Sequence, residues 1–140
     1  MKNPTPADVV ALMMKNDYYS QWLGIEILEV SDGCCRIRMT TRREMLNGFG
    51  IVHGGVTTAF ADSALAFASN NHNRLSVALD ISMSFPVAAK EGDTLIAEAR
   101  ELHLSNKVGM YQVTVSNQNQ QIVGIFKGTV YRTTKLHIEP

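Results

Sequence analysis

Residues 47–70 read NGFGIVHGGVTTAFADSALAFASN, a glycine-rich segment that runs directly into an alanine-rich one. Four glycines fall within residues 48–55, a composition typical of a loop and not of core packing. The residues from Val56 to Asn70 are dominated by Ala, Phe, Leu and Ser, which predicts a buried helix. Its alanines favour helix and are small, so a sheet can approach this helix closely on more than one side.

The residues before this stretch predict one helix and one hairpin. Apolar residues recur at helical spacing from Ala7 to Trp22, and Gly24 ends the pattern. Ile25–Val30 and Cys34–Thr40 alternate and flank Ser31-Asp32-Gly33. Asp-Gly between two alternating runs is a strong hairpin signal because glycine accepts a positive φ.

The residues after it predict strands. Apolar residues occupy every odd position from 75 to 85, which indicates a half-buried strand that Pro86 ends. Alternation continues in Asp93–Leu104, Lys107–Ser116 and Gln121–Tyr131. We therefore expect one α+β domain over residues 1–140, an antiparallel sheet wrapped around the central helix. Such a sheet leaves a face and an edge to cover, so we expect dimerisation.

Composition argues against several classes of partner. The 13 basic and 13 acidic residues cancel, and no long basic cluster occurs, so nucleic acid is not an expected partner. No apolar run approaches the roughly 20 residues that span a bilayer. The first six residues are not followed by the apolar core of a signal peptide, so we expect a cytoplasmic protein without a membrane partner.

The residues that bind metals elsewhere do not form a metal-binding pattern here. Cys34 and Cys35 are adjacent, which suits two reduced cysteines on opposite faces of a strand better than a zinc site. The histidines are scattered without ligand spacing. We expect neither a metal nor a separate cofactor.

The loop-to-helix junction is the best candidate for chemistry. Glycine leaves backbone N–H groups uncovered, and the first N–H groups of a helix lack internal partners and lie at its positive end. The dinucleotide fingerprint fails, because position 53 is His where a glycine is required. A thioester carbonyl fits better, since its oxygen gains negative charge during hydrolysis and N–H donors stabilise it.

Two polar residues accompany this junction. Asp62 lies in an otherwise apolar helix, where an unpaired carboxylate is expensive, so it is a candidate nucleophile or general base for water. The alternative is a structural carboxylate satisfied by a neighbouring hydroxyl or cation, and Ser63 and Thr58 are close in sequence. His53 precedes the helix, and capping or orientation is a better interpretation of it than direct acid–base work.

These residues carry a family resemblance. Residues 45–48, His53-Gly54-Gly55 and Ala61-Asp62 together resemble the hotdog-fold thioesterase superfamily, most closely the PaaI type associated with phenylacetate degradation. The likeness extends over nearly the whole chain. It implies an α+β hotdog fold, a dimer with a continuous sheet, a tetramer built as a dimer of dimers, and active sites between subunits.

The resemblance also implies roles for individual residues. Asp62 would be the catalytic carboxylate and would come from the partner chain, while the N–H of Gly54 or Gly55 would polarise the carbonyl. Asn47 and His53 would orient the thioester or the water. CoA would be part of the substrate and not a cofactor, with Lys107 and Arg132 as candidate contacts to its phosphates. Relatives often carry a hydroxyl where this chain has Ala78, and Ser76 or Ser82 could replace it.

The expected activity is hydrolysis of an acyl-CoA, with an aryl- or arylacetyl group such as phenylacetyl or hydroxyphenylacetyl. Phe49, Phe60 and Phe67 could wall an acyl pocket or fill the core. Two other functions stay open on the same fold: a hydratase or dehydratase, and a non-catalytic acyl-CoA-binding module. The position of His53 at the helix entry disfavours the first, and the presence of Asp62 disfavours the second.

Overall fold

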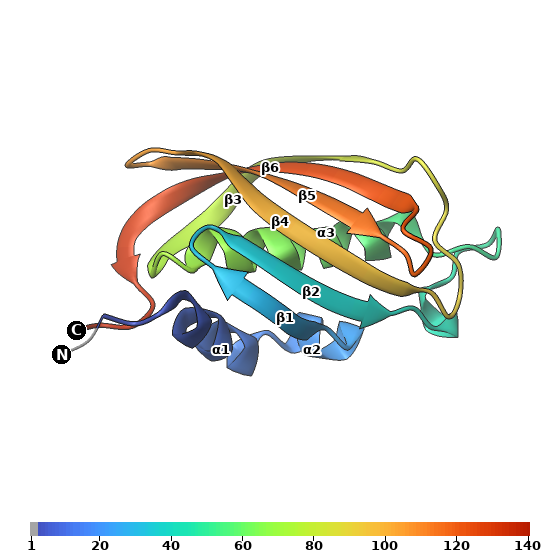
Figure 1. Ribbon diagram of the computed structural model, residues 1–140, viewed down its shortest axis with the longest axis horizontal. Coiled ribbons are helices and arrows are strands. Elements are labelled where there is room, and N and C mark those ends of the chain that lie inside the picture. Colours follow the sequence, from blue (N-terminus) through green and yellow to red (C-terminus); the bar gives the residue numbers. More distant parts are fainter. Residues whose placement is uncertain (1–2) are drawn as a thin grey trace.

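A six-stranded antiparallel sheet curls around one long helix, as Figure 1 shows for a computed structural model that describes residues 3–140. The central helix is α3, Gly54–Asn70. The strand order is β1-β2-β4-β5-β6-β3, and the α+β prediction is confirmed. The strands are β1 (Glu26–Ser31), β2 (Cys34–Thr40), β3 (Arg74–Ser84), β4 (Thr94–Leu104), β5 (Val108–Ser116) and β6 (Ile122–Leu136).

The core lies between α3 and the concave face of the sheet. Phe60, Leu65 and Phe67 of α3 are fully buried there, and each such side chain contributes about 1.5–3 kcal/mol through burial. Small residues let the layers approach. A Cβ on Gly128 of β6 would lie 2.6 Å from the Leu65 side chain, so a larger residue there would displace Leu65 from its packed position.

The amino-terminal helix predicted over residues 7–22 is wrong in one respect, because it is two helices. α1 spans Pro6–Asn16 and α2 spans Tyr18–Leu23. Asp17 between them has the non-helical angles φ −91° and ψ 79°, and its carboxylate accepts a hydrogen bond from Ser20 N at 2.9 Å. Aspartate competes with helix in this way, since its side chain caps a new helix start.

The predicted hairpin of β1 and β2 is confirmed. Gly33 at its turn has φ 70°, the left-handed conformation that favours glycine. Asn71, just after α3, fixes the turn by accepting a hydrogen bond from Gly33 N at 2.9 Å. The segment predicted as a loop before α3 contains a short 3-10 helix, Arg43–Met45, and one bridge between Leu46 and Val52.

Strand β3 forms one edge of the sheet and pairs with β6 alone among residues 3–140. The apolar residues predicted to be half-buried are largely open in the single chain: Leu79 is 62% exposed and Val77 49%. A register shift between Ala78 and Asp80 breaks the alternation, so Ile81 pairs with Gly128 and Val77 with Tyr131. The edge strand thus presents an uncovered apolar strip.

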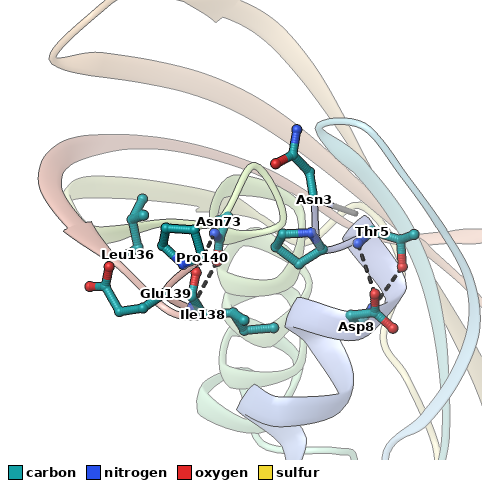
Figure 2. Close-up of a pocket in the computed structure, with 9 residues that line it drawn as sticks. Asn3, Thr5, Asp8, Asn73, Leu136, Ile138, Glu139 and Pro140 are labelled. Carbon is teal, nitrogen blue, oxygen red and sulfur yellow. Dashed lines mark hydrogen bonds between the residues drawn. The ribbon is translucent and has the colours of Figure 1, made fainter. Parts of the chain in front are cut away.

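The two ends of the described chain lie together (Figure 1). Between them is a hollow of about 600 Å³, shown in Figure 2, where Asn73 Nδ2 donates to Ile138 O and Asp8 caps α1 with Thr5. None of the candidate site residues lines this hollow. No helix within residues 3–140 is long and apolar enough to cross a membrane.

Candidate active site

The loop before α3 is held by Asn47. Its side-chain oxygen accepts hydrogen bonds from Phe49 N at 2.9 Å and Ile51 N at 3.4 Å, and its backbone N–H donates to Ile51 O at 2.8 Å. Gly50 completes the turn at φ 77°. Within residues 3–140 the side-chain nitrogen Nδ2 of Asn47 has no hydrogen-bond partner, so it is available as a donor.

His53 caps α3, as the sequence analysis favoured. Its Nδ1 accepts a hydrogen bond from Gly55 N at 2.8 Å, and its backbone carbonyl accepts one from Val56 N at 2.9 Å. Because Nδ1 is an acceptor, the proton of the neutral ring is on Nε2. The imidazole therefore caps the helix with one nitrogen and presents an N–H donor with the other.

Gly54 is the free donor at the start of α3. The sequence could not choose between Gly54 and Gly55, but His53 occupies the Gly55 N–H. The Gly54 N–H has no acceptor in the part of the chain that the structure describes. The ring of Phe85 covers this glycine, since a Cβ there would lie 3.2 Å from Phe85 Cζ. A carbonyl oxygen can approach Gly54 with an aromatic ring beside it.

Asp62 lies on the face of α3 that the sheet leaves open toward β3. It borders a small cavity of about 100 Å³, whose polar lining also includes Ser69 and Ser76. More than a third of its surface is exposed in the single chain, yet burial against its neighbours raises the pKa of the Asp62 carboxyl above its ordinary value. The negative charge of Asp17 raises it further.

One chain does not bring all the predicted residues together. Asn47, His53 and Gly54 gather at the start of α3, whereas Asp62 is eight residues along the helix, about 12 Å away by helix rise. Ala78 lines the cavity beside Asp62, as does Ser76, whose hydroxyl donates to Arg74 O at 3.1 Å.

The two candidate phosphate contacts differ in availability. Lys107 is exposed in the turn between β4 and β5. Arg132 is buried, and its Nη1 donates to Ser105 O at 2.6 Å, which fastens that turn to β6. Burial and the neighbouring Arg74 lower the pKa of the Arg132 guanidinium. Of these two side chains, Lys107 is the one open to an incoming phosphate in the single chain.

The three phenylalanines considered as pocket walls also separate. Phe60 and Phe67 are fully buried in the core, so they fill space around α3. Phe49 is 89% exposed at the tip of the glycine loop. Sequence reasoning missed Phe85 and Asp17, although Phe85 could have been suspected from its position beside the strand-ending Pro86. Among the residues described, no three His, Cys, Asp or Glu side chains cluster as a metal site requires.

Comparison with known proteins gives consistent matches. The profile of the thioesterase superfamily matches residues 49–123. A putative esterase of Archaeoglobus fulgidus is 39% identical over 123 residues, which are 88% of this chain and 80% of that protein. The acyl-coenzyme A thioesterase PaaI of Escherichia coli is 35% identical over 120 residues, 86% of each chain. The solved structure of E. coli PaaI, from the phenylacetic acid degradation operon, superposes with a TM-score of 0.92 at 32% identity, covering 94% of this chain and 95% of that one.

Proposed function

The chain belongs to the thioesterase superfamily and has its hotdog fold, and we propose that the acyl-CoA thioesters it hydrolyses carry aryl or arylacetyl groups such as phenylacetyl or hydroxyphenylacetyl. The resemblance to PaaI, a protein of the phenylacetic acid degradation operon, supports this acyl class. The hydrolase class itself follows from the family.

The observation that carries thioester hydrolysis at this site is the unpaired N–H of Gly54 at the positive end of α3. The thioester carbonyl oxygen accepts this hydrogen bond and gains negative charge as the carbonyl is attacked. One such donor is worth about 3–4 kcal/mol in the transition state. Asn47 and the Nε2–H of His53 supply further donors at the same end of the helix, where they orient the thioester or the attacking water.

Asp62 supplies the carboxylate from the partner chain. Asp62 shares a cavity with Ser76 and Ala78 of the edge strand β3, which supports a dimer that pairs two β3 edges and brings each Asp62 near the interface. Asp62 either takes the proton of an attacking water or attacks the carbonyl itself, after which water cleaves the anhydride. Both routes break the C–S bond and release the acid and the CoA thiol.

Exposed aromatic rings suit an aromatic acyl group. Phe85 lies against Gly54, and Phe49 projects from the loop that Asn47 holds. Rings in such positions pack against an aryl group edge-to-face or offset. Lys107 then remains the better of the two candidates for a CoA phosphate, with Arg132 positioning its turn.

The assembly is a homodimer, and two dimers form a tetramer.

The proposal is tested by thiol release from a panel of short, medium, long and aromatic acyl-CoAs. Wild-type protein is expected to prefer an aromatic member, and Asp62→Ala to lose the activity. Asp32→Asn in the exposed hairpin turn is the control and retains it, because Asn-Gly suits the same turn. Tight CoA-ester binding without thiol release from any member would instead identify a binding module.

A further inference from the structure

The break between α1 and α2 brings a second carboxylate, Asp17, close to the turn of α3 that carries Asp62. Asp17 Oδ2 accepts a hydrogen bond from Ser20 Oγ at 2.7 Å, and Ser20 Oγ lies 2.8 Å from Ser63 Oγ, the residue after Asp62. Ser20 and Ser63 are both buried, so these contacts fasten the α1–α2 junction to the turn of α3 that carries Asp62. Asp17 is thereby linked through Ser20 to the residue that follows Asp62 in α3.

We propose that Asp17 is a positioning residue for Asp62, holding a second negative charge against it from the α1–α2 junction. Like charges disfavour ionisation of their neighbour, so Asp62 keeps a proton more strongly than an isolated carboxylate does. Once ionised, it is a better proton acceptor and a better nucleophile. The effect of Asp17 on hydrolysis rests on the proposed function, but its effect on the titration of Asp62 does not.

The surroundings of Asp62 leave Asp17 as its charged neighbour. The cavity beside Asp62 is lined by α3, β3 and β6 with residues that carry no charge: Leu65, Ala66, Ser69, Ser76, Ala78 and Val130. His137 lies across a surface hollow from Asp17 and bonds to Asn70. Burial and Lys135 lower the pKa of His137, which disfavours a positive charge on its ring. Among residues 3–140, Asp17 is the charged group whose field raises the pKa of Asp62.

Capping alone does not require a charge at this position. Asp17 begins α2 by accepting from Ser20 N, which Asn or Ser performs about as well. Two neutral replacements, Asp17→Asn and Asp17→Ser, therefore keep the helix start and remove the charge. Asp8→Asn is the matched control, because Asp8 is also a capping carboxylate at a helix start and lies on the exposed side of α1.

The test has two readouts. Aspartate side-chain carbons are labelled with ¹³C and the titration of Asp62 is followed by NMR without substrate, with Asp62→Asn assigning the signal. The pH dependence of kcat/KM for the best acyl-CoA of the panel is then measured for the same proteins. Thermal unfolding verifies that each variant is folded.

We expect both Asp17 variants to move the Asp62 midpoint and the acid limb of kcat/KM to lower pH, and Asp8→Asn to leave both in place. An unmoved Asp62 midpoint in both Asp17 variants, or an equal movement in Asp8→Asn, would overturn the assignment. Absence of hydrolysis by the wild type would refute the proposed function, yet the NMR titration would still decide whether Asp17 acts on Asp62.

Discussion

Gly54 and Gly55 differ in whether their backbone N–H is free to bind a substrate. The sequence places both glycines at the helix start, and only the position of the His53 ring shows which N–H is free. Side-chain placement of this kind depends on the three-dimensional arrangement of the loop, including the hydrogen bond from His53 N to Met45 O at 2.8 Å. Residue identity therefore predicted the donors as a pair, and the structure selects one.

Gly54→Pro removes this donor with little other change. Gly54 is the first residue of α3, where proline is well tolerated, and His53 before it already has the extended angles φ −58° and ψ 133° that proline requires. We expect kcat to fall about 10²–10³-fold, the effect of losing one oxyanion donor. Gly54→Ala is the control, since it adds a Cβ against the same Phe85 ring but keeps the N–H. Equal losses in both variants would contradict the role of the N–H.

The raised pKa of Asp62 also has a consequence for stability. A carboxyl whose pKa is higher in the folded state stabilises the fold below its unfolded pKa of about 3.8, and this stabilisation is lost as the pH rises through the folded value. At a pH above the folded pKa the ionised group therefore opposes folding. Asp62→Asn should melt at a higher temperature than wild type at pH 7, and the gap should close toward pH 3.5. A pH-independent gap in calorimetric scans would show that charge is not its origin.

At the level of elements, the sequence predicted those whose local pattern and packing agree. The alanine-rich α3 and the Asp32-Gly33 hairpin were both found close to their expected bounds. The break at Asp17 was not foreseen, because the apolar spacing continues through this residue, whereas the cap depends on its carboxylate accepting from Ser20 N. The exposure of β3 in the single chain was not predicted. Alternation indicates that one face of a strand is buried, but it does not tell whether the same chain or a second copy buries it.

The β1–β2 hairpin depends on Gly33 for two separable reasons. Its φ of 70° costs a residue with a Cβ about 1–2 kcal/mol, and a Cβ would also collide with the carboxylate of Glu101. Glu101 cannot move away freely, since its Oε2 accepts from Tyr111 Oη and contacts His72 Nε2, each at 2.7 Å. Gly92 has a similar φ of 83° with open space around it. In denaturant titrations Gly33→Ala should therefore destabilise the protein more than Gly92→Ala. Equal losses of stability would show that the collision with Glu101 does not contribute.

For the whole molecule, the uncovered strip on β3 makes assembly testable. Leu79→Asp places a charge in that strip, where burial against a second copy would be costly. We expect dissociation to monomers in sedimentation velocity runs and loss of thioester hydrolysis. Tyr19→Asp is the control. Tyr19 is 52% exposed, comparable with Leu79, and it lies on α2 and not on β3. A Leu79→Asp dimer with full activity would contradict pairing through β3.

Sharing of the site between chains predicts complementation. Gly54→Pro and Asp62→Ala chains each lack one half of every site, so each alone should be nearly inactive. Mixed dimers contain one site with both halves intact, and random pairing of equal amounts should restore roughly a quarter of the wild-type activity. Thiol release is measured after the two proteins are unfolded and refolded together. No recovery beyond the sum of the separate proteins would place Asp62 and Gly54 of one site in the same chain.

The order of the strands also governs how the chain can be made. Strand β6 is the last along the sequence, yet it lies between β5 and β3 in the sheet. Until residues 122–136 have been synthesised, strand β3 lacks its pairing strand and the part of α3 that packs against β6 is uncovered. Closure of the sheet must therefore follow synthesis of β6, and until then the unpaired edge and the uncovered apolar surface are open to aggregation.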